Sequence, residues 1–356
     1  SDAAGNAAAY VVTTASVKTG NFGTALGTLP LLAADGSPTK VTRVFATVRG
    51  DPSITWADFN AVTGRLDCGG EEEFARCAEN HRLDVLRNDP AIGALQVEPF
   101  SLFVDVLLGR VYVTHLTSGQ VTLVSAPPRL GESPVLVDVI GGLFAPVPSG
   151  ATRAVGVAAR VPGDAAGLVY VTSSTEARIA TVKVTGGAGQ AARLVRGPSF
   201  FASDVTLSGL PDDSRGIAFS ADGSRAVLVH RSPPEIVVFD TSTGPGGLPR
   251  NERLGSVEVC EQPAVVALAD LGEGLRAFVP CFATGHTWTV DVDSLALLSV
   301  AEVGRGPAGV VVAPGRRKVY VANYADDTIA VLDVAPQSRM ENQTVLRLGR
   351  ERRSND

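Results

Sequence analysis

The sequence has one Met, two Trp and four His among 356 residues, and it has no long apolar run. A helix that crosses a bilayer needs about 20 mostly apolar residues, so no transmembrane segment is expected. Basic residues form no stripe: the densest group is the tail Arg347–Arg353, and the formal net charge is −6. Because affinity for phosphates needs concentrated cations, we expect no nucleic-acid partner. A signal peptide is also lacking, which decides nothing about the compartment because a mature chain has lost it.

Cysteines are few and form two pairs that are local in sequence, Cys68 with Cys77 and Cys260 with Cys281. Neither pair has the C-x-x-C spacing, and C-x-x-C-H is absent, so zinc-ribbon, thioredoxin-like and c-type haem sites lack support. Two disulfides in an exported protein, Cys68–Cys77 and Cys260–Cys281, fit this pattern best. Four reduced and buried thiols are the alternative.

Turn-forming residues are abundant. The chain contains 38 Gly and 22 Pro, its hydrophobic content is 45%, and its apolar runs are short and bounded by Gly, Pro, Asp or Ser. Long helices are hard to place in such a sequence, whereas strands separated by turns fit it well. The composition therefore predicts an all-β protein with an ample core.

An internal repeat refines this prediction. Three segments each read as an alternating strand, a polar turn and a second alternating strand, which is an antiparallel hairpin: Arg110–Ser125, Arg225–Thr241 and Arg317–Val334. A further strand precedes each hairpin, as in Arg215–Gly223 and Pro307–Gly315, and a fourth follows, as in Val135–Val139 and Thr344–Leu348. Four consecutive antiparallel strands make one propeller blade.

The second strands can be phased along the whole chain on one large residue. Its successive positions are Tyr10, Phe45, Tyr112, Tyr170, Val227, Phe278 and Tyr320. This spacing predicts a β-propeller of seven four-stranded blades with inserted loops. We expect Tyr112, Tyr170, Phe278 and Tyr320 to pack between adjacent blades. We also expect one domain over residues 1–356, with an insertion at 69–96 and a tail at 350–356.

The repeat resembles the YVTN family of seven-bladed propellers. Val319–Asn323 (VYVAN), Ile329–Asp333 (IAVLD) and Val237–Gly244 (VVFDTSTG) are the closest matches to its signature. The resemblance implies a propeller fold and an exported location: periplasm, cell surface or medium. It implies no particular activity, because propellers host enzymes, cofactor domains and interaction surfaces.

One segment departs from the repeat. Glu71–Leu86 begins with acidic residues and places Phe74, Cys77, Ala78 and Val85 at helical offsets, which predicts a short amphipathic helix. It lies in a connection between two blades. It would cover part of the face that also carries the loops between second and third strands.

All four histidines are expected on that same face. His115 and His230 follow the second strand at equivalent positions, where the other repeats have Thr13, Val48, Ser173, Cys281 and Asn323, while His286 and His81 belong to loops of the same side. Acidic or amide residues start the neighbouring inner strands: Glu98, Asp213, Glu261 and Gln262. Imidazoles and carboxylates around a central opening suit a transition metal or an anionic ligand. His115 and His230 are the predicted metal ligands, and His81, His115, His230, His286, Asn323, Glu98 and Glu261 form the predicted binding face.

The catalytic motifs are absent: the sequence has no P-loop, no G-x-S-x-G and no H-E-x-x-H. Asp291–Ser294 and Asp326-Asp327 could offer oxygens to calcium but lie in turns, where Asp caps its own backbone. We therefore predict an exported binding or scaffolding module, rather than an enzyme, for a protein, glycan or cell-envelope partner. The alternative is a propeller enzyme, either a lactonase-like hydrolase or a cofactor- or metal-binding oxidoreductase component, with its site at the central opening.

Overall fold

Strands account for nearly all of the regular structure, as the alternating apolar pattern predicts. The computed structural model describes residues 17–19, 23–70, 76–84, 95–146, 153–186, 191–202 and 213–349. In the first blade, the strands are β1 (Gly23–Leu32), β2 (Pro38–Val48), β3 (Ser53–Asn60) and β4 (Arg65–Asp67), and β5 (Arg82–Asp84) also pairs with β3. All these pairs are antiparallel, as consecutive strands joined by short turns must be.

Five more sheets repeat this plan along the chain. Blade 2 has β6 (Pro99–Asp105), β7 (Arg110–His115), β8 (Val121–Ser125) and β9 (Val135–Ile140). Blade 3 has β10 (Ala154–Ala159), β11 (Val169–Ser173), β12 (Arg178–Thr185) and β13 (Arg193–Arg196), with β14 (Phe200–Phe201) also on β12. Blade 4 has β15 (Ser214–Phe219), β16 (Arg225–Arg231), β17 (Pro234–Asp240) and β18 (Glu252–Glu258).

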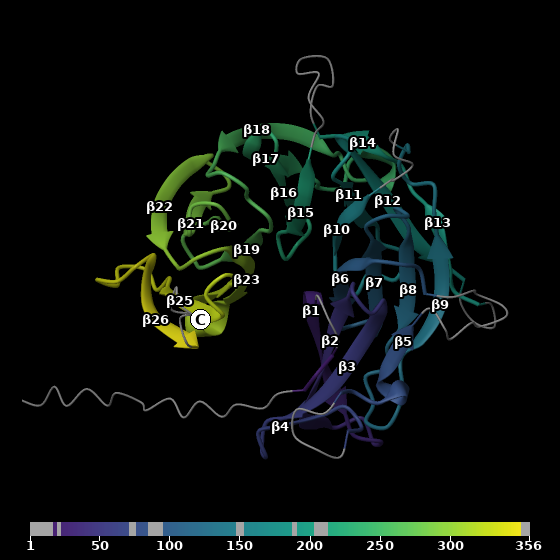
Figure 1. The fold of residues 1–356 in the computed structure, drawn as a ribbon. Helices are drawn as coiled ribbons and strands as arrows, with labels where there is room; N and C mark the ends of the chain where they lie inside the picture. The colour runs from purple at the N-terminus through teal and green to yellow at the C-terminus, as the bar shows by residue number, and fades with distance from the viewer. Residues whose placement is uncertain are drawn as a thin grey trace, which may run out of the picture.

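Blade 5 has β19 (Ala267–Asp270), β20 (Leu275–Cys281), β21 (His286–Asp291) and β22 (Ala296–Glu302). Blade 6 has β23 (Pro307–Ala313), β24 (Lys318–Asn323), β25 (Thr328–Asp333) and β26 (Gln343–Gly349). Figure 1 shows the six sheets arranged in a ring, with the first strand of each sheet innermost and the fourth outermost. The protein is a β-propeller.

The predicted number of blades was wrong. The part of the chain that the structure describes forms six four-stranded sheets rather than seven. Six of the seven phased positions, from Phe45 to Tyr320, lie on the second strand of a sheet. The remaining one, Tyr10, lies outside the described residues.

The phased residues fill the interfaces between blades. Phe45, Tyr170, Val227 and Phe278 are fully buried, and Tyr112 is 3% exposed. Tyr112 packs with residues of blade 3, Tyr170 with blade 4 and Phe278 with blade 6. The predicted packing is therefore confirmed for these three. Tyr320, in the last blade, is only partly buried.

The predicted helix over residues 71–86 was wrong for the part that is described. Residues 76–84 hold a single 3₁₀ turn, Glu79–His81, followed by β5. Two constraints override the helical periodicity there. The disulfide to Cys68 fixes Cys77, and Arg82–Asp84 pairs with Ser53–Thr55 at the edge of β3, which satisfies backbone groups that a helix would have bonded internally.

Both predicted disulfides are present. Cys68 and Cys77 have Cα atoms 4.9 Å apart, and Cys260 and Cys281 have Cα atoms 5.7 Å apart. The first closes a loop beside blade 1, and the second ties the connection between blades 4 and 5 to the end of β20. No helix among the described residues is long and apolar enough to cross a membrane.

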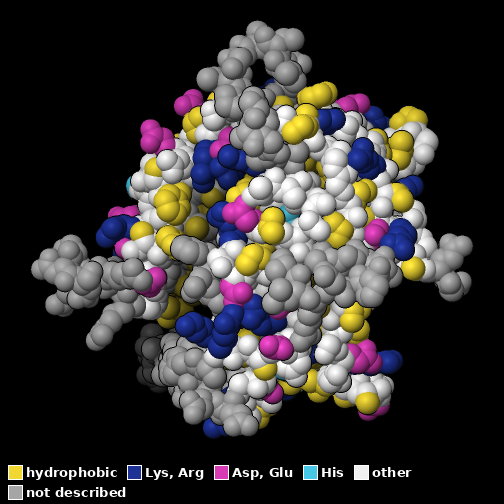
Figure 2. Space-filling model, turned by 45° about the vertical axis from the view of Figure 1, so that its right-hand side comes forward, with side chains coloured by type: hydrophobic (Ala, Val, Ile, Leu, Met, Phe, Trp, Pro, Cys, Tyr) yellow, Lys and Arg dark blue, Asp and Glu magenta, His cyan; other side chains and the backbone are white. Residues whose placement is uncertain are grey.

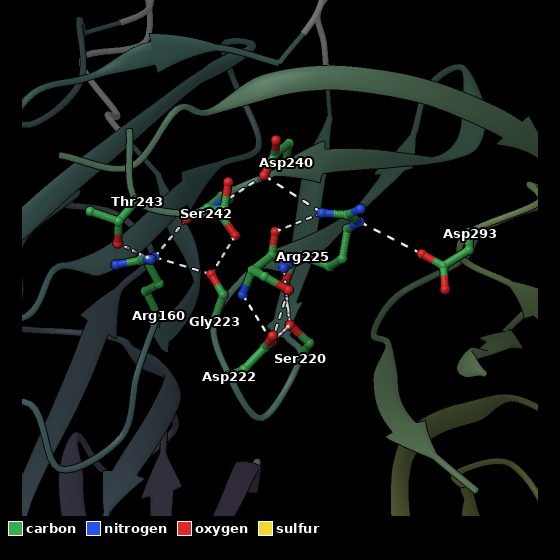
Figure 3. Close-up of polar contacts among 11 residues, drawn as sticks. Arg160, Ser220, Asp222, Gly223, Arg225, Asp240, Ser242, Thr243 and Asp293 are labelled. Atoms are coloured by element: carbon green, nitrogen blue, oxygen red, sulfur yellow. Dashed lines mark hydrogen bonds and ion pairs between the residues drawn. The ribbon is translucent and has the colours of Figure 1, made fainter. Parts of the chain in front are cut away.

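On the face formed by the turns between first and second strands, polar contacts join three consecutive blades (Figure 3). Arg160, at the end of β10, donates from Nε to the carbonyl oxygens of Gly223 and Thr241 in blade 4. Arg225 of β16 forms ion pairs with Asp240 and with Asp293 of blade 5, at 3.5 and 3.7 Å. These contacts fix the blades relative to one another at the face opposite the candidate site.

Candidate functional site

A backbone hydrogen bond repeats around the opposite face. In blades 2 to 6, the carbonyl oxygen of the residue before the inner strand accepts from the amide of the residue at the end of the second strand. The pairs are Glu98 with Leu116, Arg153 with Ser174, Asp213 with Arg231, Gln262 with Phe282, and Gly306 with Tyr324. We call these ten residues the rim. Its backbone is fixed by the fold, so its side chains are free to vary with function.

Four of the five residues that lead into the inner strands have a left-handed backbone. Their φ angles are 49° for Glu98, 37° for Arg153, 56° for Gln262 and 62° for Gly306. This conformation is rare for residues other than Gly, and it tends to occur at binding and catalytic positions. The rim therefore holds three polar side chains on strained backbone at equivalent places.

The first charged cluster of the rim joins blades 1 and 2. Arg49 donates to Glu98 Oε1 over 2.8 Å, and the hydroxyl of Thr117 contacts the other carboxylate oxygen. The guanidinium of Arg49 also lies over the ring of Phe100, 5.8 Å from its centroid. Both carboxylate oxygens of Glu98 are thus engaged.

A second cluster lies in blade 4. Asp213 pairs with Arg215 through both carboxylate oxygens, each 2.7 Å from a guanidinium nitrogen. Arg231 lies beside them, and its buried Nε has no hydrogen-bond partner among the residues that the structure describes. Burial lowers the pKa of Arg231, and neighbouring Arg215 lowers it further, while Asp213 opposes this shift. Two guanidinium groups thus share one carboxylate, which leaves positive charge for a ligand.

Behind this cluster, three polar residues form a row across the sheet. Ser214 lies opposite His230, and His230 lies opposite Glu235, in the ladders of β15, β16 and β17. His230 Nδ1 is 3.5 Å from Glu235 Oε1, and neither Ser214 Oγ nor the His230 ring nitrogens make a hydrogen bond. Ser214 and His230 are fully buried. The row packs against the charged cluster, with Ser214 and His230 buried and Glu235 partly exposed.

The predicted metal ligand His115 is also buried, but its ring is satisfied. Nδ1 lies 3.1 Å from the carbonyl oxygen of Val97, and Nε2 lies 2.8 Å from Thr122 Oγ1. Desolvation lowers the pKa of His115 to about 4. Metal binding would require one of these hydrogen bonds to break. Among the described residues, no three or more His, Cys, Asp or Glu side chains gather as a metal site.

The other predicted site residues are not gathered at one point. His81 stacks on Trp56 beside β3, with ring centroids 5.7 Å apart, so the structure does not bring it to the inner strands. His286 starts β21 opposite Cys281, and Glu261 is exposed next to Gln262. Asn323 is buried and donates to Val303 O and Thr328 Oγ1. Of the predicted set, Glu98 contributes a side chain to the rim itself.

The sequence reasoning had named Asp213 and Gln262 but missed Arg49, Arg215, Arg231, Phe282 and Tyr324. Four of these directly follow the second strand, four residues beyond the phased large residue. That fixed offset was visible in the repeat and was the signal for them. On the face shown in Figure 2, Lys and Arg side chains form several separate groups, with Asp and Glu side chains beside them.

No family model and no curated protein matches this chain, but solved structures do. A periplasmic gluconolactonase of Pseudomonas aeruginosa superposes with a TM-score of 0.60 at 18% identity, over 91% of this chain and 85% of that one. A putative 6-phosphogluconolactonase of Bacteroides fragilis gives 0.59 at 16% identity, over 87% and 79%. The dihydro-heme d1 dehydrogenase NirN gives 0.51 at 14% identity, over 91% and 56%. At these identities the likeness shows the propeller fold alone.

These comparisons correct two predictions. Membership of the YVTN family is not supported by any family model, and what is shown is the propeller fold. The prediction of a binding or scaffolding module is contradicted, because solved structures that share the fold include propellers named as lactonases.

Proposed function

We propose that the protein is an exported hydrolase that opens the ring ester of a sugar lactone at the rim of blade 4. The observation that supports it is the cluster of Asp213, Arg215 and Arg231, in which a partly exposed carboxylate lies beside an arginine whose Nε has no hydrogen-bond partner among the described residues. The lactonase names of propellers with this fold point to the same chemistry. The two disulfides and the periplasmic location of one such protein support export.

Lactone hydrolysis needs a base for water and a cation near the carbonyl oxygen. Asp213, oriented by its ion pair with Arg215, accepts a proton from the attacking water as the water oxygen bonds to the carbonyl carbon. Arg231 stabilises the negative charge that develops on the carbonyl oxygen, and its Nε has no hydrogen bond to a described residue that must break first. When the tetrahedral intermediate collapses, the bond from carbon to ring oxygen breaks, and the leaving oxygen takes the proton back from Asp213. The product is the open hydroxy acid.

Asp213 is favoured over Glu98 as the base. Both carboxylates are already engaged, Glu98 by Arg49 and Thr117 and Asp213 by Arg215, so only the neighbouring cation distinguishes them. Among the described contacts, no second arginine lies beside Glu98. Asp213 has Arg231 close by, so base and charge-stabilising group occur together.

The test is proton release from glucono-1,5-lactone, measured above the spontaneous rate in buffer. Asp213→Asn should lower kcat by roughly 10²–10⁴-fold, the usual contribution of a general base. Arg231→Gln should lower it by roughly 10²–10³-fold. Glu302→Gln is the control, because that carboxylate is 77% exposed on an outer strand. A wild-type rate equal to the blank across a panel of lactones, or full activity in Asp213→Asn, would refute the proposal.

A further inference from the structure

The rim changes character next to the catalytic cluster. At the position that holds Leu116, Ser174 and Arg231 in blades 2 to 4, blades 5 and 6 hold Phe282 and Tyr324. Tyr324 is 69% exposed, and Phe282 is partly buried. The core does not need large side chains at these two positions. Phe278 of the same strand as Phe282 is fully buried between blades, and Tyr320 of the same strand as Tyr324 is partly buried.

The two aromatic residues lie on either side of Gly306. The amide of Tyr324 donates to the carbonyl oxygen of Gly306 over 2.9 Å. A Cβ atom added at Gly306 would lie 3.3 Å from Phe282 Cε2, and the φ angle of Gly306 is +62°. A larger residue there would be crowded by Ala325 and the Phe282 ring and would strain the backbone, so glycine suits the position between the strand ends that carry the two aromatics.

Residues with hydrogen-bonding side chains neighbour the two aromatics along the backbone of the rim. Gln262 is exposed and its carbonyl oxygen accepts from the amide of Phe282. Arg305 is 71% exposed, with Nε 3.7 Å from the buried carboxylate of Asp326. Flat apolar surface edged by amide and guanidinium donors suits a ligand that is apolar on its faces and polar around its edge. A pyranose ring has this character.

The pair is also continuous with the blade 4 cluster. The amide of Gly216, on the inner strand that carries Arg215, donates to Ala264 O at the start of blade 5 over 3.3 Å. Gln262 lies two residues before Ala264. Consecutive blades therefore place the aromatic pair on the rim directly after the proposed catalytic residues.

We propose that Phe282 and Tyr324 form a stacking subsite for a second sugar ring, so that the preferred substrate is the lactone of an oligosaccharide aldonic acid. This inference rests on the proposed lactone hydrolysis for the substrate's reactive end, but the subsite binds sugar whether or not the reaction occurs. An extended sugar is favoured over a protein partner because the flanking groups are single donors spaced around two rings.

The experiment compares one-ring and two-ring probes. Hydrolysis of glucono-1,5-lactone and of maltobiono-1,5-lactone is measured for the wild type, Tyr324→Ala, Tyr324→Phe and Phe282→Ala, and binding of maltobionate is measured by calorimetry. The wild type should favour the two-ring lactone in kcat/KM. Tyr324→Ala and Phe282→Ala should each lower this preference and the maltobionate affinity by about threefold to tenfold. Tyr324→Phe should retain both. Phe201→Ala, which truncates an aromatic 59% exposed in blade 3, is the matched control.

The outcomes separate this inference from the proposed function. If the wild type binds maltobionate, Tyr324→Ala does not, and neither lactone is hydrolysed, the proposed hydrolase is refuted and the subsite is supported. Equal use of both lactones by the wild type, with no effect of either alanine variant, would overturn the subsite and leave the hydrolase intact. No maltobionate binding by the wild type would likewise overturn the subsite.

Discussion

His115 Nε2 lies 2.8 Å from Thr122 Oγ1. His230 is the equivalent histidine of blade 4, but there Val237 stands at the position of Thr122, so the hydroxyl is missing. His115 is thus a satisfied core histidine, whereas His230 lacks an equivalent hydroxyl and faces Glu235 instead. Two histidines at one repeat position therefore have different chemistry, and only the neighbouring strand reveals it.

The burial of His115 predicts a pH-dependent stability. Its pKa falls from 6.5 to about 4 on folding, mainly through desolvation. Above about pH 6.5 the ring is neutral in both states and its contribution is complete. Between about pH 6.5 and pH 4 the unfolded chain binds a proton that the folded one does not, so stability falls, by on the order of 3 kcal/mol in full.

Urea denaturation of the wild type and of His115→Gln as a function of pH measures this loss. His115→Gln is expected to be less stable than the wild type at neutral pH, but its free energy of unfolding should not show the fall between about pH 6.5 and pH 4 that His115 causes. His286→Gln serves as the control. A decline of the same size in His115→Gln would show that other groups cause it.

Tyr170 should be among the most costly aromatic residues to truncate. Its ring is fully buried, packs edge-on against Phe219 with centroids 4.8 Å apart, and its hydroxyl donates to Asn251 Oδ1 over 2.8 Å. Tyr170→Ala should cost about 3–5 kcal/mol, and Tyr170→Phe about 0.5–1.5 kcal/mol for the hydrogen bond. Chemical denaturation measures both. Tyr324→Ala, at an exposed site, should change stability by less than about 0.5 kcal/mol.

The two disulfides should each stabilise the folded chain. The paired cysteines are 9 and 21 residues apart in sequence, which in the chain-entropy model corresponds to about 2.6 and about 3.3 kcal/mol. The double variants Cys68→Ala/Cys77→Ala and Cys260→Ala/Cys281→Ala should show this loss in denaturation, and reductant should no longer act on the removed bridge. Mass spectrometry after alkylation of native protein provides the direct check: four modified thiols would contradict both bonds.

Gly156 should not tolerate a side chain. An added Cβ would lie 2.3 Å from Arg215 O and 2.6 Å from Thr172 Oγ1, at the contact between the inner strands of blades 3 and 4. Gly156→Ala should destabilise by about 1–3 kcal/mol, as overpacking does, and it should disturb the Asp213–Arg215 pair. Gly315→Ala is the matched control, since nothing lies within 4 Å of its added Cβ. Equal stability of the two variants would refute this close approach.

Local patterns determined most of the fold. The alternation in segments such as Arg317–Val334 fixes which side chains share a face, because neighbouring residues of a strand point to opposite sides whatever the rest of the chain does. The same periodicity placed Tyr112, Tyr170 and Phe278 between blades, and the spacing of the cysteines gave both disulfides. These are short-range properties, and they were readable without coordinates.

Contacts between distant segments decided the rest. The pairing of Arg82–Asp84 with β3, nearly thirty residues earlier in the chain, replaced the helix that the periodicity of Glu71–Leu86 predicted. Asp213 forms its ion pair with Arg215 rather than with Arg231 because of how the strand ends pack. In the same way, the register of the second and third strands places Thr122 beside His115, whereas blade 4 has Val237 at that position. A sequence specifies each strand's own faces through local geometry. The partner that each polar group meets across two strands is set only when the strands and sheets pack together, because burial then leaves a polar group only the neighbours that the packing provides.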